Sequence, residues 1–312
     1  MDTATAHSNK STTVRKPVVP TWLRSGLQVA DRVAPSWTDR WLRKMYFSPA
    51  RMKVTPGQQQ VLNEGTRFTF DSQGEAVVAH AWGDSNKAVW LVHGWAGNLG
   101  QLTVLVKPLL EQGFRVIGFD WPGHGASSGS VASLLHTRTA MMKLHALVGQ
   151  PWGVVAHSFG ASATTLCMAA GLGAERLAFI APAIKLQPYV DTFSLAMGLS
   201  PSQKSRFVKS SEAWLKAPFS DFEPMKVVPT LSAPLLIAHS VDDREAPFSD
   251  AEQLAQTWSG ATLQSYEKLG HRRILNEAKV IDETVAHLQV TTSWASLSDW
   301  RRWGPRRSRL VG

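Results

Sequence analysis

The 312-residue sequence contains one cysteine, Cys167, so an intrachain disulfide is excluded. It has no apolar run near the ~20 residues that span a bilayer. Its first 18 residues lack the apolar core of a secretory signal. We therefore expect a soluble, cytoplasmic protein in which Cys167 is a small core residue.

Two kinds of cofactor motif are also missing. No cluster of Cys and His has the spacing of metal ligands, and no G-x-x-x-x-G-K-[ST] loop is available for phosphate. The sequence thus predicts a function that needs neither a metal nor a nucleotide cofactor.

The net charge of +9 is concentrated at the two ends of the chain. Residues 1–55 hold ten Lys or Arg against three Asp, and residues 289–312 hold five Arg against one Asp. The 233 residues between them are therefore close to neutral, near −2. A nucleic-acid partner is not expected, whereas contact of the basic ends with an anionic membrane stays an alternative.

The most specific signal is the pentapeptide Ala156-His157-Ser158-Phe159-Gly160. It stands between an apolar run at 152–156 and a helix-like stretch of small residues at 160–170. A serine on such a strand-to-helix turn is typical of a nucleophile elbow, although Ala156 replaces the first glycine of G-x-S-x-G. Ser158 is therefore the candidate nucleophile.

An acid and a histidine follow in the order that suits this serine. Asp242 and Asp243 come after the apolar run at 235–238, and His271 follows the alternating run at 262–266. His271 is the best of ten histidines for the base because it follows the last predicted strand, 28 residues after Asp243. Ser, acid and His in this chain order match one of the known triad arrangements.

With these segments, the chain resembles bacterial α/β-hydrolase-fold serine hydrolases of the esterase and lipase type. The resemblance spans roughly residues 66–288 and rests on VHGWAG at 92–97, FDWPGHGAS at 119–127, the elbow, the Asp243 loop and GHRR at 270–273. It implies that Asp243, four residues before Pro247, is the acid, with Asp242 as its rival. It also implies an oxyanion hole formed by the backbone N–H groups of Trp95 and Phe159.

The remaining pattern predicts the architecture. Entry strands at 66–70 and 76–82 precede alternating strands and helices, which indicate a doubly wound, mostly parallel sheet. We expect an α/β-hydrolase core at 61–183 and 234–288, interrupted by a small helical cap at 184–233 that precedes the strand bearing the acid. A basic, partly helical extension at 1–60 and a basic tail at 289–312 complete the predicted domains.

Two helices are predicted in the N-terminal extension. One covers 22–33 with Leu23, Leu27 and Ala30 on a stripe, and the second begins at Ser36 with Asp39 as part of a capping box. Trp37, Trp41 and Met45 would form the apolar face of the second helix. We expect this helix to dock on the body, with membrane contact as the less favoured alternative.

Together these features predict a metal-free serine hydrolase that cleaves a carboxylic ester or thioester with an apolar acyl group. Other reactions on the same fold, namely C–C bond hydrolysis, haloperoxidation and acyl transfer, stay open. A non-catalytic binding protein on a hydrolase scaffold is the alternative from another class.

Overall fold

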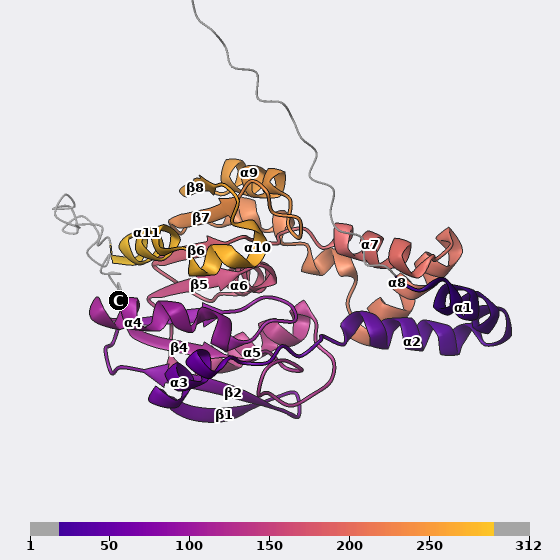
Figure 1. Cartoon of the computed structure of the whole chain (residues 1–312), viewed down its shortest axis with the longest axis horizontal. Coiled ribbons are helices and arrows are strands. Elements are labelled where there is room, and N and C mark those ends of the chain that lie inside the picture. The colour runs from indigo at the N-terminus through magenta and orange to yellow at the C-terminus, as the bar shows by residue number, and fades with distance from the viewer. Residues whose placement is uncertain (1–18, 290–312) are drawn as a thin grey trace, which may run out of the picture.

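A computed structural model describes residues 19–289, which form a body around a twisted sheet and an arm that projects from its side (Figure 1). The eight strands lie in the order β1-β2-β4-β3-β5-β6-β7-β8. β2 is antiparallel to β1 and β4, and all later neighbours are parallel. The strands are β1 Thr66–Ser72, β2 Glu75–Trp82, β3 Ala88–Val92, β4 Arg115–Phe119, β5 Gly153–His157, β6 Arg176–Ile180, β7 Leu235–Ser240 and β8 Ala261–Tyr266.

Helices cover both faces of this sheet, because the central parallel strands are apolar on both sides. Strands β3, β5 and β6 are buried along their whole length. One face packs against α5 (Leu134–Val148), α6 (Phe159–Ala169) and α9 (Phe248–Thr257). The other packs against η1 (Leu99–Leu105), α4 (Val106–Glu111), α11 (Ala278–Gln289) and α3 (Pro56–Glu64). This arrangement confirms the predicted doubly wound sheet.

The arm consists of four helices from two distant parts of the sequence (Figure 1). They are α1 (Thr21–Val33), α2 (Pro35–Phe47), α7 (Gln187–Met197) and α8 (Pro201–Leu215). The last two belong to the segment between β6 and β7, which continues in η2 (Phe219–Phe222), η3 (Pro224–Lys226) and η4 (Val228–Thr230). Helices α1 and α2 pack on each other, and α2 packs on α8.

Two ion pairs fasten the N-terminal helices to α8. Arg206 of α8 binds both Asp31 of α1 and Asp39 of α2. The capping box expected from Ser36 and Asp39 is therefore wrong. Helix α2 begins at Pro35, its N-cap Ala34 makes no side-chain hydrogen bond, and Asp39 pairs with Arg206 instead. Proline suits the first helical position because it lacks the N–H that would be unpaired there.

The expectation for the second helix also needs a correction at its buried face. Thr38, Leu42 and Phe47 are the buried residues of α2, whereas Trp37 is exposed. Trp41 and Met45 do pack against the core, so the predicted stripe holds for these two residues and fails at Trp37. Within residues 19–289, no helix combines the length and apolar character needed to cross a membrane.

Candidate active site

Ser158 lies on the sharp turn between β5 and α6, as an elbow requires. Its φ of 54° and ψ of −126° are strained for a residue with a side chain. Gly160 makes the turn feasible, since a Cβ there would lie 2.4 Å from the carbonyl oxygen of Val92. Ala156 stays within β5, so the alanine that replaces the usual glycine needs no special backbone geometry.

The structure brings together the three side chains that the sequence selected. Oγ of Ser158 lies 2.9 Å from Nε2 of His271, and Nδ1 of His271 lies 2.7 Å from Oδ2 of Asp243. Each follows the carboxyl end of a different parallel strand, β5, β7 or β8. These ends meet at one edge of the sheet, where open α/β sheets place their functional groups. All three residues are buried.

Asp243 is held as an anion by the groups around it. Burial alone would raise its pKa, but hydrogen bonds from His239 and His271 outweigh burial and hold that pKa well below its usual range. The backbone N–H groups of Glu245 and Ala246 donate to its other oxygen. An ionised carboxylate fixed in this way can orient the His271 ring and stabilise its protonated form.

The rival acid, Asp242, faces a different group. It accepts hydrogen bonds from the Ser240 hydroxyl and from the N–H of Gly270 at 3.1 Å. Asp242 thus holds the loop before His271 in place, and neither of these two hydrogen bonds involves the His271 imidazole. The Ser240 hydroxyl reinforces the same loop, because it also accepts a hydrogen bond from the backbone N–H of Leu269.

His157 forms a hydrogen bond with the backbone of His271. Its Nε2 lies 2.9 Å from the carbonyl oxygen of His271, and the two rings are 4.9 Å apart. Burial, with the nearby charge of His271, lowers the pKa of His157 to about 3, so it is neutral and can donate to that carbonyl. His157 therefore holds the backbone of His271 in place beside the nucleophile.

The loop that carries Trp95 lies directly against the nucleophile. A Cβ on Gly94 would lie 2.6 Å from Cβ of Ser158, so only glycine allows this approach. Trp95 and Phe159 line the same cavity as Ser158 and His271. Their backbone N–H groups remain the proposed oxyanion donors.

Three buried side chains brace this loop, and sequence reasoning did not assign them this role. Nε2 of His93 accepts the N–H of Trp121, and Nε2 of His124 accepts the N–H of Ala96, both at 3.0 Å. The carboxylate of Asp120 accepts the N–H groups of Leu99 and Ala126. In the sequence these three residues stood out only as members of the strings VHGWAG and FDWPGHGAS, which supported the family resemblance without assigning a role to each residue.

Both bracing histidines must be neutral to accept these hydrogen bonds. Burial lowers the pKa of His93 to about 4 and that of His124 to about 3. An imidazole whose Nδ1–H is engaged by a carbonyl can accept only through Nε2. That carbonyl belongs to Gly94 for His93 and to Pro122 for His124.

Two cavities adjoin next to the nucleophile. The one that contains Ser158 and His271 has a volume of about 270 Å³ and is also lined by Arg244, Glu245 and Arg272. The second has about 330 Å³ and is mostly apolar. They share four lining residues, namely Trp95, Phe159, Tyr189 and Thr192.

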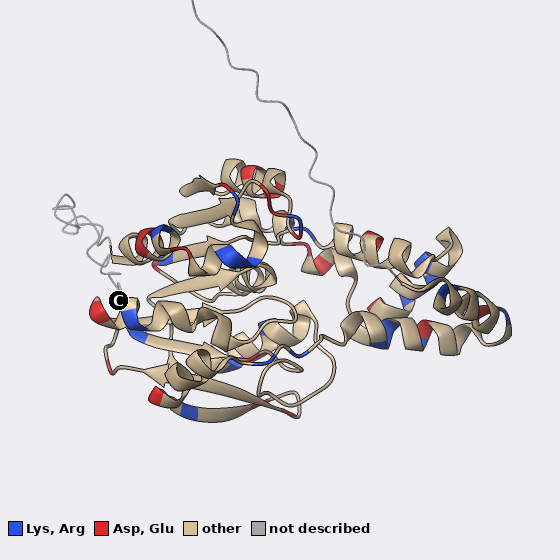
Figure 2. Ribbon diagram, viewed as in Figure 1, with Lys and Arg blue, Asp and Glu red and all other residues tan. Residues whose placement is uncertain are grey.

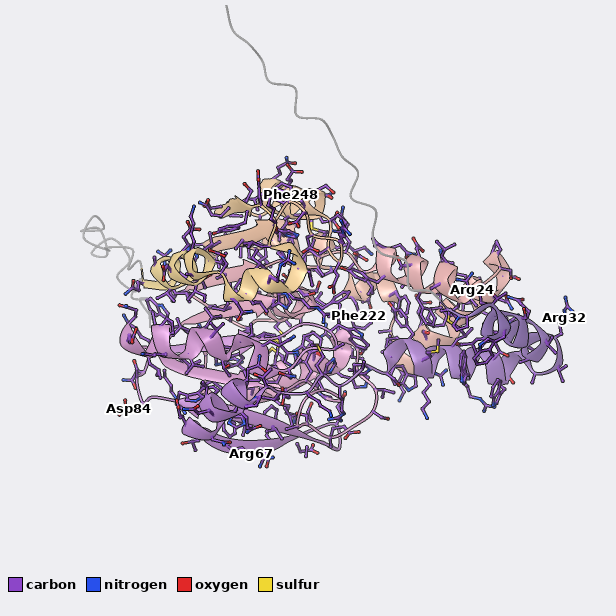
Figure 3. The ribbon with its side chains drawn as sticks, viewed as in Figure 1. Arg24, Arg32, Arg67, Asp84, Phe222 and Phe248 are labelled. Atoms are coloured by element: carbon purple, nitrogen blue, oxygen red, sulfur yellow. The ribbon has the colours of Figure 1, made fainter. Side chains whose placement is uncertain are left out.

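The apolar cavity draws its wall from three parts of the chain. Helix α2 supplies Met45, Tyr46 and Phe47. The segment between β6 and β7 and the body supply the rest, including Leu186, Phe193, Leu215, Phe219, Phe222, Trp121 and Leu134. Figure 3 shows Phe222 where the arm meets the body. The contribution of α2 was not foreseen from the sequence, which assigned 1–60 no part in the site.

No group of three or more Cys, His, Asp or Glu side chains within residues 19–289 is arranged to hold a metal ion. Cys167 is buried, as expected, and burial raises the pKa of its thiol to about 12. The side chains that can react in this site are those joined by the hydrogen bonds between Ser158, His271 and Asp243.

Comparison with known proteins agrees with the architecture. Residues 83–221 match the family described as serine aminopeptidase, S33. A serine hydrolase-like protein of Danio rerio is 34% identical over 85 residues, which are 25% of this chain and 26% of that protein. The chain therefore matches about a quarter of the length of this curated relative.

Solved structures of similar fold match most of the chain at low identity. A lipase of Acinetobacter baumannii, described as putative, is 18% identical with a TM-score of 0.59 and covers 76% of this chain and 96% of its own. An esterase of Exiguobacterium antarcticum is 18% identical with a TM-score of 0.57 and covers 72% and 100%. The resemblance to the α/β-hydrolase fold is thus confirmed.

Proposed function

We propose that this α/β-hydrolase-fold protein is a serine hydrolase that cleaves carboxylic esters through an acyl-enzyme. The observation that carries the proposal is the chain of two hydrogen bonds that joins Ser158 to His271 and His271 to Asp243. A serine hydroxyl is weakly nucleophilic unless a base can take its proton, and this geometry supplies the base.

The first half of the reaction forms the acyl-enzyme. Oγ of Ser158 attacks the ester carbonyl carbon while Nε2 of His271 takes the hydroxyl proton. The negative charge on the carbonyl oxygen is stabilised by the N–H groups of Trp95 and Phe159. The bond to the alcohol oxygen then breaks, and His271 returns the proton to the departing alcohol.

Water completes the cycle. It attacks the acyl carbon as His271 takes a proton, and the acid leaves when Ser158 regains that proton. The products are one carboxylic acid and one alcohol for each ester and water consumed. Asp243 stays ionised throughout and stabilises the imidazolium.

The substrate class follows from the two cavities. The apolar cavity beside Phe159 suits an acyl chain of short to medium length, and each buried CH₂ would favour binding by at most about 0.8 kcal/mol. The cavity of Ser158 carries Arg244, Glu245 and Arg272, so it suits a polar alcohol group. No nucleic acid or cofactor takes part in this proposal.

A hydrolysis screen tests the proposal. p-Nitrophenyl esters and the matching thioesters, from acetyl to long acyl chains, should be cleaved, with a preference for apolar over charged acyl groups. Ser158→Ala should lower the rate on the order of 10⁶-fold, as expected when a triad serine is removed. If wild-type protein cleaves none of the series, the alternative of a binding protein on a hydrolase scaffold is favoured.

A further inference from the structure

The arm carries most of the strongly exposed large apolar side chains among residues 19–289. Five of the eight lie on it: Trp22, Val29 and Val33 on α1, Trp37 on α2 and Leu195 on α7. Isolated exposed apolar residues are ordinary, whereas a group of them on adjacent helices indicates an interaction surface.

Helix α1 has two apolar sides. Leu23 and Leu27 face inward, and Leu27 is buried. Trp22, Val29 and Val33 follow one another at i, i+7 and i+11, which places them on one line along another side of the helix. Their exposed fractions are 73%, 59% and 82%, so this outer line has no partner among the described residues.

The first turn of α2 adds another exposed apolar side chain beside exposed cations. Trp37, which is 51% exposed, lies beyond the break at Ala34 that separates α2 from α1. Arg40 and Lys44 follow Trp37 at i+3 and i+7 and are exposed on the same side of α2. Arg32 is also exposed and lies at the outer end of the arm (Figure 3).

These cations have no carboxylate to neutralise them among residues 19–289. The acidic residues of the two helices, Asp31 and Asp39, are both bound to Arg206 on the inner side. Neither Arg32, Arg40 nor Lys44 takes part in an ion pair within the same range. Figure 2 shows the resulting cationic segments on α2 and at the end of the arm.

We propose that this tip surface, formed by Trp22, Val29, Arg32, Val33, Trp37, Arg40 and Lys44, binds the surface of an anionic lipid bilayer. Exposed aliphatic residues enter the boundary between headgroups and acyl chains, and tryptophan prefers that boundary. Lys and Arg beside them bind the anionic headgroups. The structure thus supplies both contributions that peripheral binding needs.

The charge also favours a membrane over a second copy of the chain. In a two-fold dimer the same patch would face itself, so the cations of one copy would lie against those of the other. The tip surface contains no carboxylate that could pair with them. An anionic surface is its electrostatic complement.

The same helix that would contact the bilayer also lines the apolar cavity of the candidate active site. Met45, Tyr46 and Phe47, near the end of the same helix, line the apolar cavity next to Phe159. A protein held to a bilayer through the outer side of α1 and α2 would keep that cavity close to the lipid. The binding surface itself is independent of hydrolysis.

Vesicle sedimentation with the full chain tests the proposal. Protein carrying Ser158→Ala is mixed with vesicles of phosphatidylcholine alone or with one third phosphatidylglycerol, so that hydrolysis cannot alter the lipid. We expect pelleting with the anionic vesicles at low salt and release at high salt, because salt screens the attraction. Failure to pellet with anionic vesicles at low salt would overturn the proposal.

Variants separate the tip surface from the basic ends outside the described residues. Arg40→Gln with Lys44→Gln should weaken partitioning roughly 25-fold, about fivefold for each cation. Val33→Ser with Trp37→Ser should weaken it at least as much. The matched controls are Lys143→Gln and Leu147→Ser, two exposed residues on α5 of the body, which should bind as wild type.

Two results would contradict the assignment. If the tip variants pellet as wild type while keeping its thermal unfolding midpoint, the membrane contact lies elsewhere. If light scattering shows a dimer that Val33→Ser with Trp37→Ser converts to a monomer, the surface binds a second copy instead.

Discussion

At Ser158, glycines set the geometry as much as the reacting groups do. Gly94 and Gly160 each stand where a Cβ would collide with the nucleophile or with the backbone of its neighbouring strand. The sequence predicted Ser158, Asp243 and His271 because their order and their places after strands are local features. It did not predict the bracing by His93, His124 and Asp120, because these contacts join loops that meet only in the folded chain.

The two neighbouring aspartates give a direct test at this scale. Asp243→Asn should reduce kcat on the order of 10⁴-fold, because an amide favours the wrong tautomer of the histidine. Asp242→Asn removes an acceptor of Ser240 and Gly270 but leaves the His271 contact, so its effect should be far smaller. Kinetics of both variants on one p-nitrophenyl ester decide the matter, and an exchange of the two effects would identify Asp242 as the acid.

At the scale of elements, the positions of the strands and of the two N-terminal helices were predictable to within about two residues, whereas breaks inside a helical segment were not. The segment after β8 is not one helix but three pieces, α10 (Gly270–Arg273), η5 (Ile274–Asn276) and α11. Glu277 is extended between them, so the short helix that carries His271 is set apart from the packing helix. Hydrophobic spacing does not reveal such a break, because both parts bury apolar residues on the same side of the sheet.

The apolar cavity provides a prediction for the element that lines it. Leu215, at the end of α8, belongs to the part of the cavity that is not shared with Ser158. Leu215→Trp should fill this part, so hydrolysis of octanoyl esters should fall at least tenfold while acetyl esters are cleaved as before. Comparison of kcat/KM for the two esters measures the effect, and an equal loss on both would show that Leu215 does not limit acyl length.

At the scale of the whole molecule, the fold was predictable from alternation of strands and helices, but the arm was not. The sequence showed an N-terminal extension and a separate cap, and only the structure shows that α2 packs on α8. That contact includes the ion pairs of Arg206 with Asp31 and Asp39. Each aspartate lies more than 160 residues before Arg206 in the chain. The basic tail at 289–312, with Trp294, Trp300 and Trp303, lies beyond the described residues apart from Gln289.

Buried neutral histidines should make the stability of the whole molecule depend on pH. His93, His124 and His157 have pKa values lowered to between about 3 and about 4, against about 6.5 when unfolded. Below pH 6.5 the unfolded chain takes up protons that the folded chain does not, so the free energy of unfolding should fall as the pH falls toward 4. Above pH 6.5 this contribution should be constant.

Urea unfolding at pH 7.5, 6 and 5 measures this dependence. His124→Gln should flatten it by the contribution of one group, about 1.4 kcal/mol per pH unit at most. Asp243 does not interfere, because its lowered pKa confines its effect to pH below its ordinary value near 3.8. An unfolding free energy that stays constant from pH 7.5 to 5 would contradict the predicted burial of neutral histidines.

In the proposed reaction, Ser158 forms a covalent acyl-enzyme. Intact-protein mass spectrometry after reaction with a fluorophosphonate probe, followed by peptide mapping, tests it most directly. We expect one added probe per chain, located on Ser158, and no addition in Ser158→Ala or in wild-type protein unfolded beforehand. A folded wild-type protein that remains unmodified, or one labelled at another residue, would contradict it.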